Sequence, residues 1–233
     1  MTTRPESSAN HRGTATLQAV LWDMDGTLID SEVEWTRAQS ALLEKFGLPP
    51  LSLEAEEQFV GVAIEQAALR FQELGVPLST VDIARAITED VAARVAAGAS
   101  WRPGVAQLLA ELQAAQIPMA VVTNSSRSIV DAMLTHLPGH SFASIVTSER
   151  VGTPKPHPEP YQLAAADLGI ATRFAIAIED SSTGVTSALR AGCNVLAVPH
   201  GVSVPDSDRY HVRRTLAGIG IAELEQLLPT AKH

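Results

Sequence analysis

The sequence predicts an α/β protein in which a parallel sheet forms the core and a helical segment is inserted near the N-terminus. Three observations predict this class: short apolar runs alternate with longer helical patterns, the runs are almost continuously apolar, and residues 31–98 contain helical patterns alone. Alternating strands and helices are typical of a parallel sheet with helices on both faces. Continuous apolar runs are typical of strands buried on both sides. The predicted fold is therefore a Rossmann-like core with an α-helical cap domain.

The strands of the sheet are predicted from the short apolar runs. Four helical patterns accompany the later runs, at residues 105–116, 126–137, 159–169 and 182–192. In each pattern the apolar residues recur every three or four positions, and several patterns end near Gly or Pro. The expected strands are Ala19–Trp22, Met119–Val122, Ser144–Val146, Ala175–Ile178 and Val195–Val198.

The inserted helical segment follows the first strand. Amphipathic patterns span residues 31–47, 65–75 and 79–98, each with a glycine at or near its end. We expect the chain to leave the core near Ile29–Glu32 and to return through residues 98–105, with Pro103 at or near a helix start. The predicted domains are a core of residues 17–31 and 99–233, a cap of residues 32–98 and a disordered leader of residues 1–16.

Composition and charge exclude several functions. The 233-residue chain has a formal charge of −9, which argues against nucleic-acid binding because phosphate backbones select basic surfaces. No apolar run approaches the length of a membrane span, and the polar N-terminus lacks the apolar stretch of a signal peptide. The single cysteine, Cys193, permits no intrachain disulfide. We expect a cytoplasmic protein that binds a small metabolite and neither nucleic acid nor membrane; monomer and dimer both stay open.

Polar residues follow three of the expected strands, at the edge of the sheet where ligands bind in this fold class. They could be turn formers or helix caps, a common role for Asp, Ser, Thr and Asn. That reading does not explain four carboxylates at one edge, because clustered acids repel each other unless a cation lies between them. Carboxylates, water and phosphate oxygens are suitable ligands of Mg²⁺. The residues at this edge are Asp23, Asp25, Thr123, Asn124, Glu179 and Asp180.

Lys155 is the cation that we expect beside these acids. It lies between Pro154 and Pro156, in a loop that follows the third strand. Proline restricts the backbone on both sides, so this lysine is a better candidate for a fixed phosphate partner than an ordinary surface lysine. The segment after Thr123 continues into a helix, and the free N–H groups at a helix start can also bind phosphate.

Together these residues resemble the haloacid dehalogenase (HAD) superfamily. The stretch DMDGT at residues 23–27 is similar to the first motif of that family, Thr123 to the second, Lys155 to the third and EDSSTG at residues 179–184 to the fourth. The four motifs occur in the family's order. The helical insertion is similar to the cap of the branch that contains phosphoglycolate phosphatase, sugar-phosphate phosphatases and β-phosphoglucomutase.

The resemblance implies a role for each residue. Asp23 would attack phosphorus and form an aspartyl-phosphate, while Asp25 would protonate the leaving oxygen and later take a proton from water. Mg²⁺ would be held by Asp23, the backbone carbonyl of Asp25 and Asp180, with Glu179 as a ligand or behind the ligands. The transferring phosphoryl group would be held by Thr123, Asn124 and Lys155.

The resemblance alone does not decide between a phosphatase and a phosphomutase. Asp25 and the acid pair Glu179–Asp180 favour phosphate chemistry over dehalogenation, which uses neither the second aspartate nor a metal. β-Phosphoglucomutase has a histidine where this chain has Trp35, and a cap arginine where it has Ile64 or Glu65. We therefore expect hydrolysis of a small phosphate monoester, with a sugar phosphate as the favoured substrate. A phosphomutase is the alternative, and a non-catalytic phosphate-binding protein is the third hypothesis.

Four further residues have simpler interpretations. Cys193 precedes an expected buried strand and has no histidine beside it, which favours core packing over catalysis. His157 is favoured as a polar turn residue, although it lies near Lys155. Arg127 could bind substrate or neutralise the acidic edge, and the sequence does not choose. Trp35 could stack on a sugar or pack inside the cap, and packing is favoured.

Overall fold

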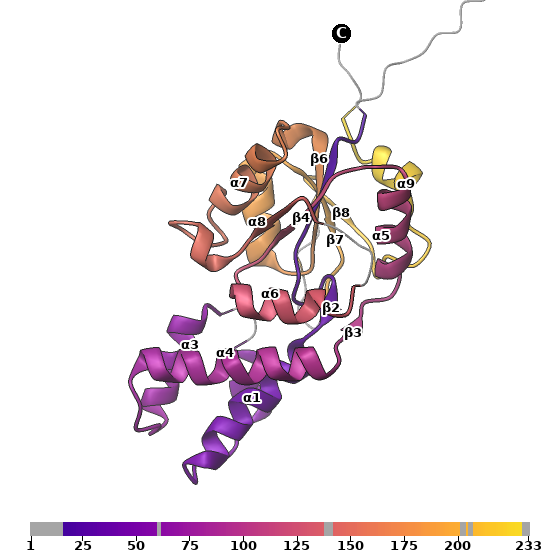
Figure 1. The fold of residues 1–233 in the computed structure, drawn as a ribbon. Helices are drawn as coiled ribbons and strands as arrows, with labels where there is room; N and C mark the ends of the chain where they lie inside the picture. Colours follow the sequence, from indigo (N-terminus) through magenta and orange to yellow (C-terminus); the bar gives the residue numbers. More distant parts are fainter. Residues whose placement is uncertain (1–15, 60–61, 138–141, 201–203, 205–206, 230–233) are drawn as a thin grey trace, which may run out of the picture.

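The computed structural model of the chain describes residues 16–59, 62–137, 142–200, 204 and 207–229. The expected leader therefore lies almost wholly outside the described residues. Within them, six strands form one sheet in the order β5-β4-β1-β6-β7-β8, and all neighbouring strands are parallel (Figure 1). The strands are β1 (Ala19–Trp22), β4 (Met119–Val122), β5 (Ser144–Val146), β6 (Ala175–Glu179), β7 (Asn194–Ala197) and β8 (His211–Val212).

Helices cover both faces of the sheet (Figure 1). Alternate residues of each strand point to opposite faces. Ala19 and Leu21 therefore belong to one apolar cluster with Tyr161, whereas Val20 and Trp22 belong to another. The first face is covered by α7 (Glu159–Asp167) and α8 (Ser182–Ala191), and the second by α5 (Val105–Ala114), α6 (Arg127–Leu134) and α9 (Ile221–Glu225). The two central strands β1 and β4 are buried at every residue, which explains why both are apolar throughout.

A separate group of helices stands below the sheet edge in Figure 1. These cap helices are α1 (Glu32–Lys45), α2 (Leu53–Glu57), α3 (Ile64–Glu73) and α4 (Thr80–Ala97). They are joined to the core by the antiparallel pair β2 (Ile29–Asp30) and β3 (Ser100–Trp101). Helix α4 packs along α6 of the core, and the ring of His136 hydrogen-bonds the carbonyl of Val95 at 2.8 Å between them. The cap therefore rests on the helix that follows β4.

The predicted fold class is confirmed, and five of the strands lie where the sequence places them. Three match residue for residue, β6 extends one residue further to include Glu179, and β7 both begins and ends one residue earlier than expected. The short elements β2, β3, α2, β8 and α9 are additions that the sequence did not indicate. In the part of the chain that the structure describes, no helix combines the length and apolarity that a membrane span requires. The proposed domain boundaries and the cytoplasmic location stay predictions.

Candidate active site

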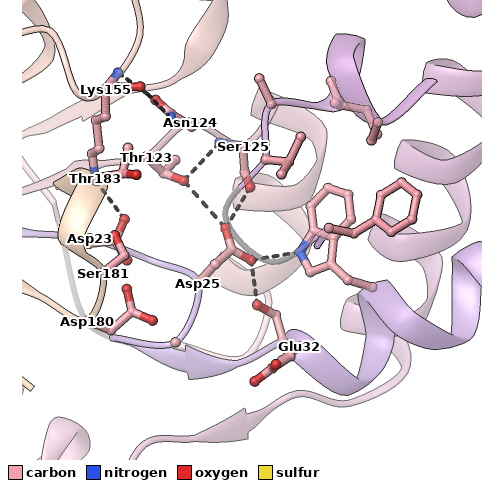
Figure 2. A pocket seen from close by; sticks show the side chains of 18 of the residues that line it. Asp23, Asp25, Glu32, Thr123, Asn124, Ser125, Lys155, Asp180, Ser181 and Thr183 are labelled. Atoms are coloured by element: carbon pink, nitrogen blue, oxygen red, sulfur yellow. Dashed lines mark hydrogen bonds and ion pairs between the residues drawn. The ribbon is translucent and has the colours of Figure 1, made fainter. Parts of the chain in front are cut away.

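The carboxyl ends of β1, β4 and β6 open into one pocket between the core and the cap (Figure 2). Its volume is about 240 Å³, enough for a small metabolite. The pocket is lined from the core by Asp23, Asp25, Thr123, Asn124, Lys155 and Asp180, all of which the sequence singled out. Glu179, the remaining expected residue, is fully buried beneath them. The structure thus brings together every residue that we expected to act on phosphate.

Lys155 and Asp23 form the buried floor of the pocket. The ammonium group of Lys155 lies 2.7 Å from Asp23 Oδ1 and 2.6 Å from Glu179 Oε1. The hydroxyl of Tyr161 donates a second hydrogen bond to that same Oε1 atom. Burial lowers the pKa of Lys155, but the charges of Asp23 and Glu179 outweigh burial and raise it above its ordinary value. The lysine is therefore a permanent positive charge beside Asp23.

Three acids at this floor are arranged to bind a cation. Asp23, Glu179 and Asp180 each offer an oxygen within 4.8 Å of the others. Burial, followed by the charge of Glu179, raises the pKa of Asp23 to about 7, although Lys155 opposes the shift. Burial and the charges of Asp23 and Glu179 raise the pKa of Asp180 to about 9. Lys155 alone does not offset the repulsion that raises these pKa values, and the three carboxylates therefore fit a divalent cation.

Gly26 allows the first motif to pass close to Asp180. Its φ is +77°, a conformation that other residues rarely adopt, and a Cβ on it would lie 2.1 Å from Asp180 Oδ2. The turn on glycine directly after Asp25 therefore has two causes: the left-handed backbone and the close approach of a carboxylate.

Asp25 accepts hydrogen bonds from both the core and the cap (Figure 2). The hydroxyl of Ser125 donates to Oδ2 at 2.6 Å, and the hydroxyl of Thr123 lies 3.5 Å from the same oxygen. Ser31, at the junction with the cap, donates to Oδ1. The indole N–H of Trp35 donates to Oδ1 from 3.1 Å. Sequence reasoning missed this contact and placed Trp35 among packing residues; its spacing four residues after Ser31 on one helix face was the available signal.

Asn124 holds the Lys155 loop in place. Its side-chain oxygen accepts from the backbone N–H of Lys155 at 3.0 Å, and its side-chain nitrogen donates to the carbonyl of Lys155 at 3.2 Å. The amide side chain is thus engaged with the loop, and its expected contact with phosphate stays a prediction. At the start of α6, the N–H of Arg127 donates to the carboxylate of Glu149, 3.0 Å away. This N–H group is therefore not free for phosphate.

Three residues of uncertain role lie outside the pocket. The guanidinium of Arg127 pairs with Asp131 at 2.8 Å on an exposed surface. His157 is half exposed and contacts Glu159, as a turn residue would. Cys193 is buried, and burial raises the pKa of its thiol to about 12, which makes the thiolate scarce near neutral pH.

The cap supplies the other wall of the pocket. Among the cap residues that line it in the described structure there is neither lysine nor arginine, and Glu32 and Glu56 add negative charge. Ile64 lines the pocket, whereas Glu65 does not and is exposed. The remaining cap residues of the wall are Trp35, Thr36, Gln39, Phe59, Val62, Ala63, Ala67 and Thr88.

The fold and this site define a hydrolase of the haloacid dehalogenase type, with an aspartate pair at the end of the first strand. A family model described as haloacid dehalogenase-like hydrolase matches residues 20–198. The chain belongs to this family, as its four motifs predict.

Relatives with assigned names extend the comparison. The chain is 36% identical over 189 residues to hexitol phosphatase A of Escherichia coli, covering 79% of this chain and 84% of that protein. It is 30% identical over 219 residues to phosphoglycolate phosphatase of Chromobacterium violaceum, covering 91% and 96%. A variant of CbbY from Rhodobacter sphaeroides, solved with xylulose-(1,5)bisphosphate, superposes with a TM-score of 0.81 at 29% identity, covering 90% of this chain and 99% of that one.

Proposed function

We propose that this protein is a Mg²⁺-dependent phosphatase that hydrolyses a small phosphate monoester through an aspartyl-phosphate on Asp23. The observation that carries the proposal is the aspartate pair at the end of β1. Lys155 contacts one member, and donors from core and cap surround the other, at the floor of one pocket. The phosphatase names of the relatives agree with this chemistry. Residues 17–31 and 99–233 would form the catalytic domain and residues 32–98 the cap.

In the first step, Oδ of Asp23 attacks phosphorus and the bond to the leaving oxygen breaks. A buried carboxylate is a weak nucleophile, but a covalent intermediate divides one difficult step into two easier ones. Lys155 stabilises the charge that develops on the phosphoryl oxygens, because its ammonium group is fixed by Glu179 and needs no reorganisation. Thr123 and Asn124 line the pocket from the end of β4, where the phosphoryl group would be bound.

Asp25 moves the protons of both steps. It donates a proton to the departing alcohol, and in the second step it removes one from the water that attacks the aspartyl-phosphate. The donors on Asp25 hold its carboxyl group in one orientation inside the pocket. Two of them, Ser31 and Trp35, come from the junction with the cap and from α1. The position of the cap therefore bears directly on proton transfer.

Asp23, Asp180 and the backbone carbonyl of Asp25 would hold Mg²⁺. When bound, the ion neutralises the acid cluster and draws charge from the phosphoryl oxygens. Glu179 accepts hydrogen bonds from Lys155 and Tyr161 on one oxygen, which supports a role in fixing the lysine behind the metal.

The cap wall favours hydrolysis over phosphate transfer between two positions of a sugar. A mutase must hold a bisphosphorylated intermediate, and its second phosphate dianion needs a cation. The cap residues of this pocket offer apolar, hydroxyl, amide and acidic groups instead. A second phosphate, or a carboxylate such as that of phosphoglycolate, would be repelled by Glu32 and Glu56. The imidazole of His200, which also lines the pocket, already lies 3.0 Å from Asp30 and 3.9 Å from Glu32. A sugar or polyol monophosphate is therefore the proposed substrate class.

The proposed function is tested by incubating the protein with polyol and aldose monophosphates, a sugar bisphosphate and phosphoglycolate, with Mg²⁺ or with a chelator. We expect release of inorganic phosphate from the monophosphates in the presence of Mg²⁺ only. An isomerised product without phosphate release would support the mutase. No reaction across the panel would support a non-catalytic phosphate-binding protein.

The acid cluster predicts how the stability of the metal-free protein depends on pH. Folding raises the pKa of Asp180 from 3.8 to about 9, and that of Asp23 from 3.8 to about 7. The folded state therefore binds more protons than the unfolded state between these values, so stability falls as pH rises through them. Mg²⁺ at about 100 times its dissociation constant should add about 2.7 kcal/mol. At one fixed Mg²⁺ concentration, the increase in melting temperature should be larger near pH 9, where the acids are ionised, than near pH 6.

The matched variant for this measurement is Asp180→Asn, which removes one negative charge from the cluster. In the metal-free state its melting temperature should exceed that of the wild type by a margin that grows with pH, and Mg²⁺ should have little effect on it. An Mg²⁺-induced shift as large as that of the wild type would show that the ion binds elsewhere.

Trp35→Phe should lower kcat about 10-fold or more and change KM little. The variant keeps an aromatic ring in the pocket wall but loses the N–H that orients Asp25, and a hydrogen bond to a charged group contributes roughly 1.5–3 kcal/mol. The measurement is steady-state kinetics beside Trp101→Phe, a matched change at the cap junction outside the pocket. Equal kcat values for the two variants would show that the N–H of Trp35 does not assist proton transfer by Asp25.

A further inference from the structure

Gln39 is a buried amide that faces the pocket without a protein partner. The residue is 6% exposed and lines the pocket, and none of the described residues hydrogen-bonds its side-chain amide. Buried polar groups are almost always hydrogen-bonded. The amide atoms of Gln39 are not among the fully buried, unpartnered atoms of the described residues, so they are reached from the pocket and are available to a bound ligand.

The position of Gln39 on α1 indicates which part of a ligand it faces. Gln39 follows Trp35 by four residues, so both lie on one helix face, roughly one turn or 5.4 Å apart. Trp35 contacts Asp25, which would lie beside the leaving oxygen. Gln39 therefore lies one helical turn beyond the reacting atoms, where the leaving group extends into the cap.

The groups around Gln39 indicate the chemistry of that leaving group. Thr36 and Thr88 bring hydroxyls to the same pocket from α1 and α4, and Phe59 and Ala67 bring apolar surface. An amide and two hydroxyls supply both donors and acceptors, which matches the two-sided hydrogen bonding of alcohol groups. The apolar surface suits the carbon chain that carries those alcohols. This combination fits an uncharged, polyhydroxylated leaving group.

We propose that Gln39 recognises the substrate by hydrogen-bonding a hydroxyl of its leaving group, two or more carbons from the phosphate. The proposal rests on the phosphatase function and adds a specificity-determining residue to it. A substrate that provides the hydroxyl satisfies an amide that is otherwise without a partner, and a substrate that lacks it leaves the amide buried and unpaired. Such sites discriminate strongly against analogues without the bonding group.

The test compares two substrates in one variant. Gln39→Met keeps the length of the side chain and removes its polar groups. For a six-carbon polyol monophosphate, we expect kcat/KM to fall about 10- to 100-fold, the effect of one or two lost hydrogen bonds. For p-nitrophenyl phosphate, whose leaving group has no further hydroxyl, the fall in kcat/KM should be at least about 5-fold smaller than for the polyol phosphate, since no bond to Gln39 is lost. Gln66→Met, an exposed position on α3, is the matched control.

The outcomes of this test distinguish a failure of the Gln39 proposal from a failure of the proposed phosphatase activity. A wild-type protein that hydrolyses neither compound overturns the phosphatase function. If the Gln39→Met variant hydrolyses the polyol phosphate as efficiently as the wild type, the role of Gln39 is overturned and the phosphatase function stands. Equal losses on both substrates also overturn it, because they indicate damage to the pocket or to the fold instead of a lost contact with the leaving group.

Discussion

Asp23→Asn is expected to abolish turnover, with kcat reduced about 10,000-fold or more, as for loss of other enzymatic nucleophiles. The amide cannot attack phosphorus, so the covalent step has no nucleophile. The change also removes one negative charge from the acid cluster and weakens Mg²⁺ binding. Asp23 is buried with a pKa raised to about 7, so replacing its carboxylate by an uncharged group of equal size should not lower the stability of the metal-free fold near pH 8.

Phosphate release by Asp23→Asn should be measured together with its melting temperature. Asp208→Asn, an exposed position outside the pocket, is the matched control and should behave as the wild type. A folded Asp23→Asn protein with near-normal phosphate release would contradict the covalent mechanism.

Lys155→Met should disable the enzyme and also destabilise the fold. The ammonium group is the shared partner of Asp23 and Glu179, and all three side chains are buried. Removing one partner of a buried ion pair leaves an uncompensated charge and typically costs about 3–5 kcal/mol. The activity should fall about 1,000-fold, because the fixed charge that stabilises the phosphoryl oxygens is lost. Denaturant unfolding and phosphate release measure the two effects.

A double variant separates stability from catalysis. Glu179→Gln together with Lys155→Met removes both charges of the buried pair, so it should recover part of the lost free energy of unfolding. It should not recover activity, since the cation beside Asp23 is still missing. Recovery of both would show that Lys155 contributes to the fold alone. A Lys155→Met protein as stable and active as the wild type would contradict the proposed site.

Much of the core could be predicted from the sequence because local patterns determine it. Three strands match residue for residue, since each is a short apolar run that ends in polar residues at the sheet edge. The short elements at the cap junction and the C-terminal side could not be predicted in this way. For example, β2 and β8 each have two residues, too few for any periodicity. Their pairing depends on distant segments of the chain.

The site was predictable in its membership and less so in its contacts. The aspartate pair, Lys155 and Asp180 follow from motif spacing, because parallel strands bring their carboxyl ends to one edge. The contact between Trp35 and Asp25 depends on how the cap rests on the core, and the partners of Glu179 depend on where α7 places Tyr161. The partners of Glu179 leave no local signal, whereas the spacing of Trp35 from Ser31 was a local signal for its contact with Asp25. The structure therefore adds a hydrogen bond to Asp25 to the predicted packing role of Trp35, which also contacts the apolar core.

Acid quenching during turnover tests the central claim most directly. The wild-type protein would be mixed with a polyol monophosphate and Mg²⁺, denatured in acid within the first turnover, digested and examined by mass spectrometry. We expect one phosphoryl group on the peptide that contains Asp23, and none on that peptide from Asp23→Asn. Rapid phosphate release with an unmodified Asp23 peptide at every quench time, or a phosphoryl group on another residue, would contradict the proposal that phosphate passes through Asp23.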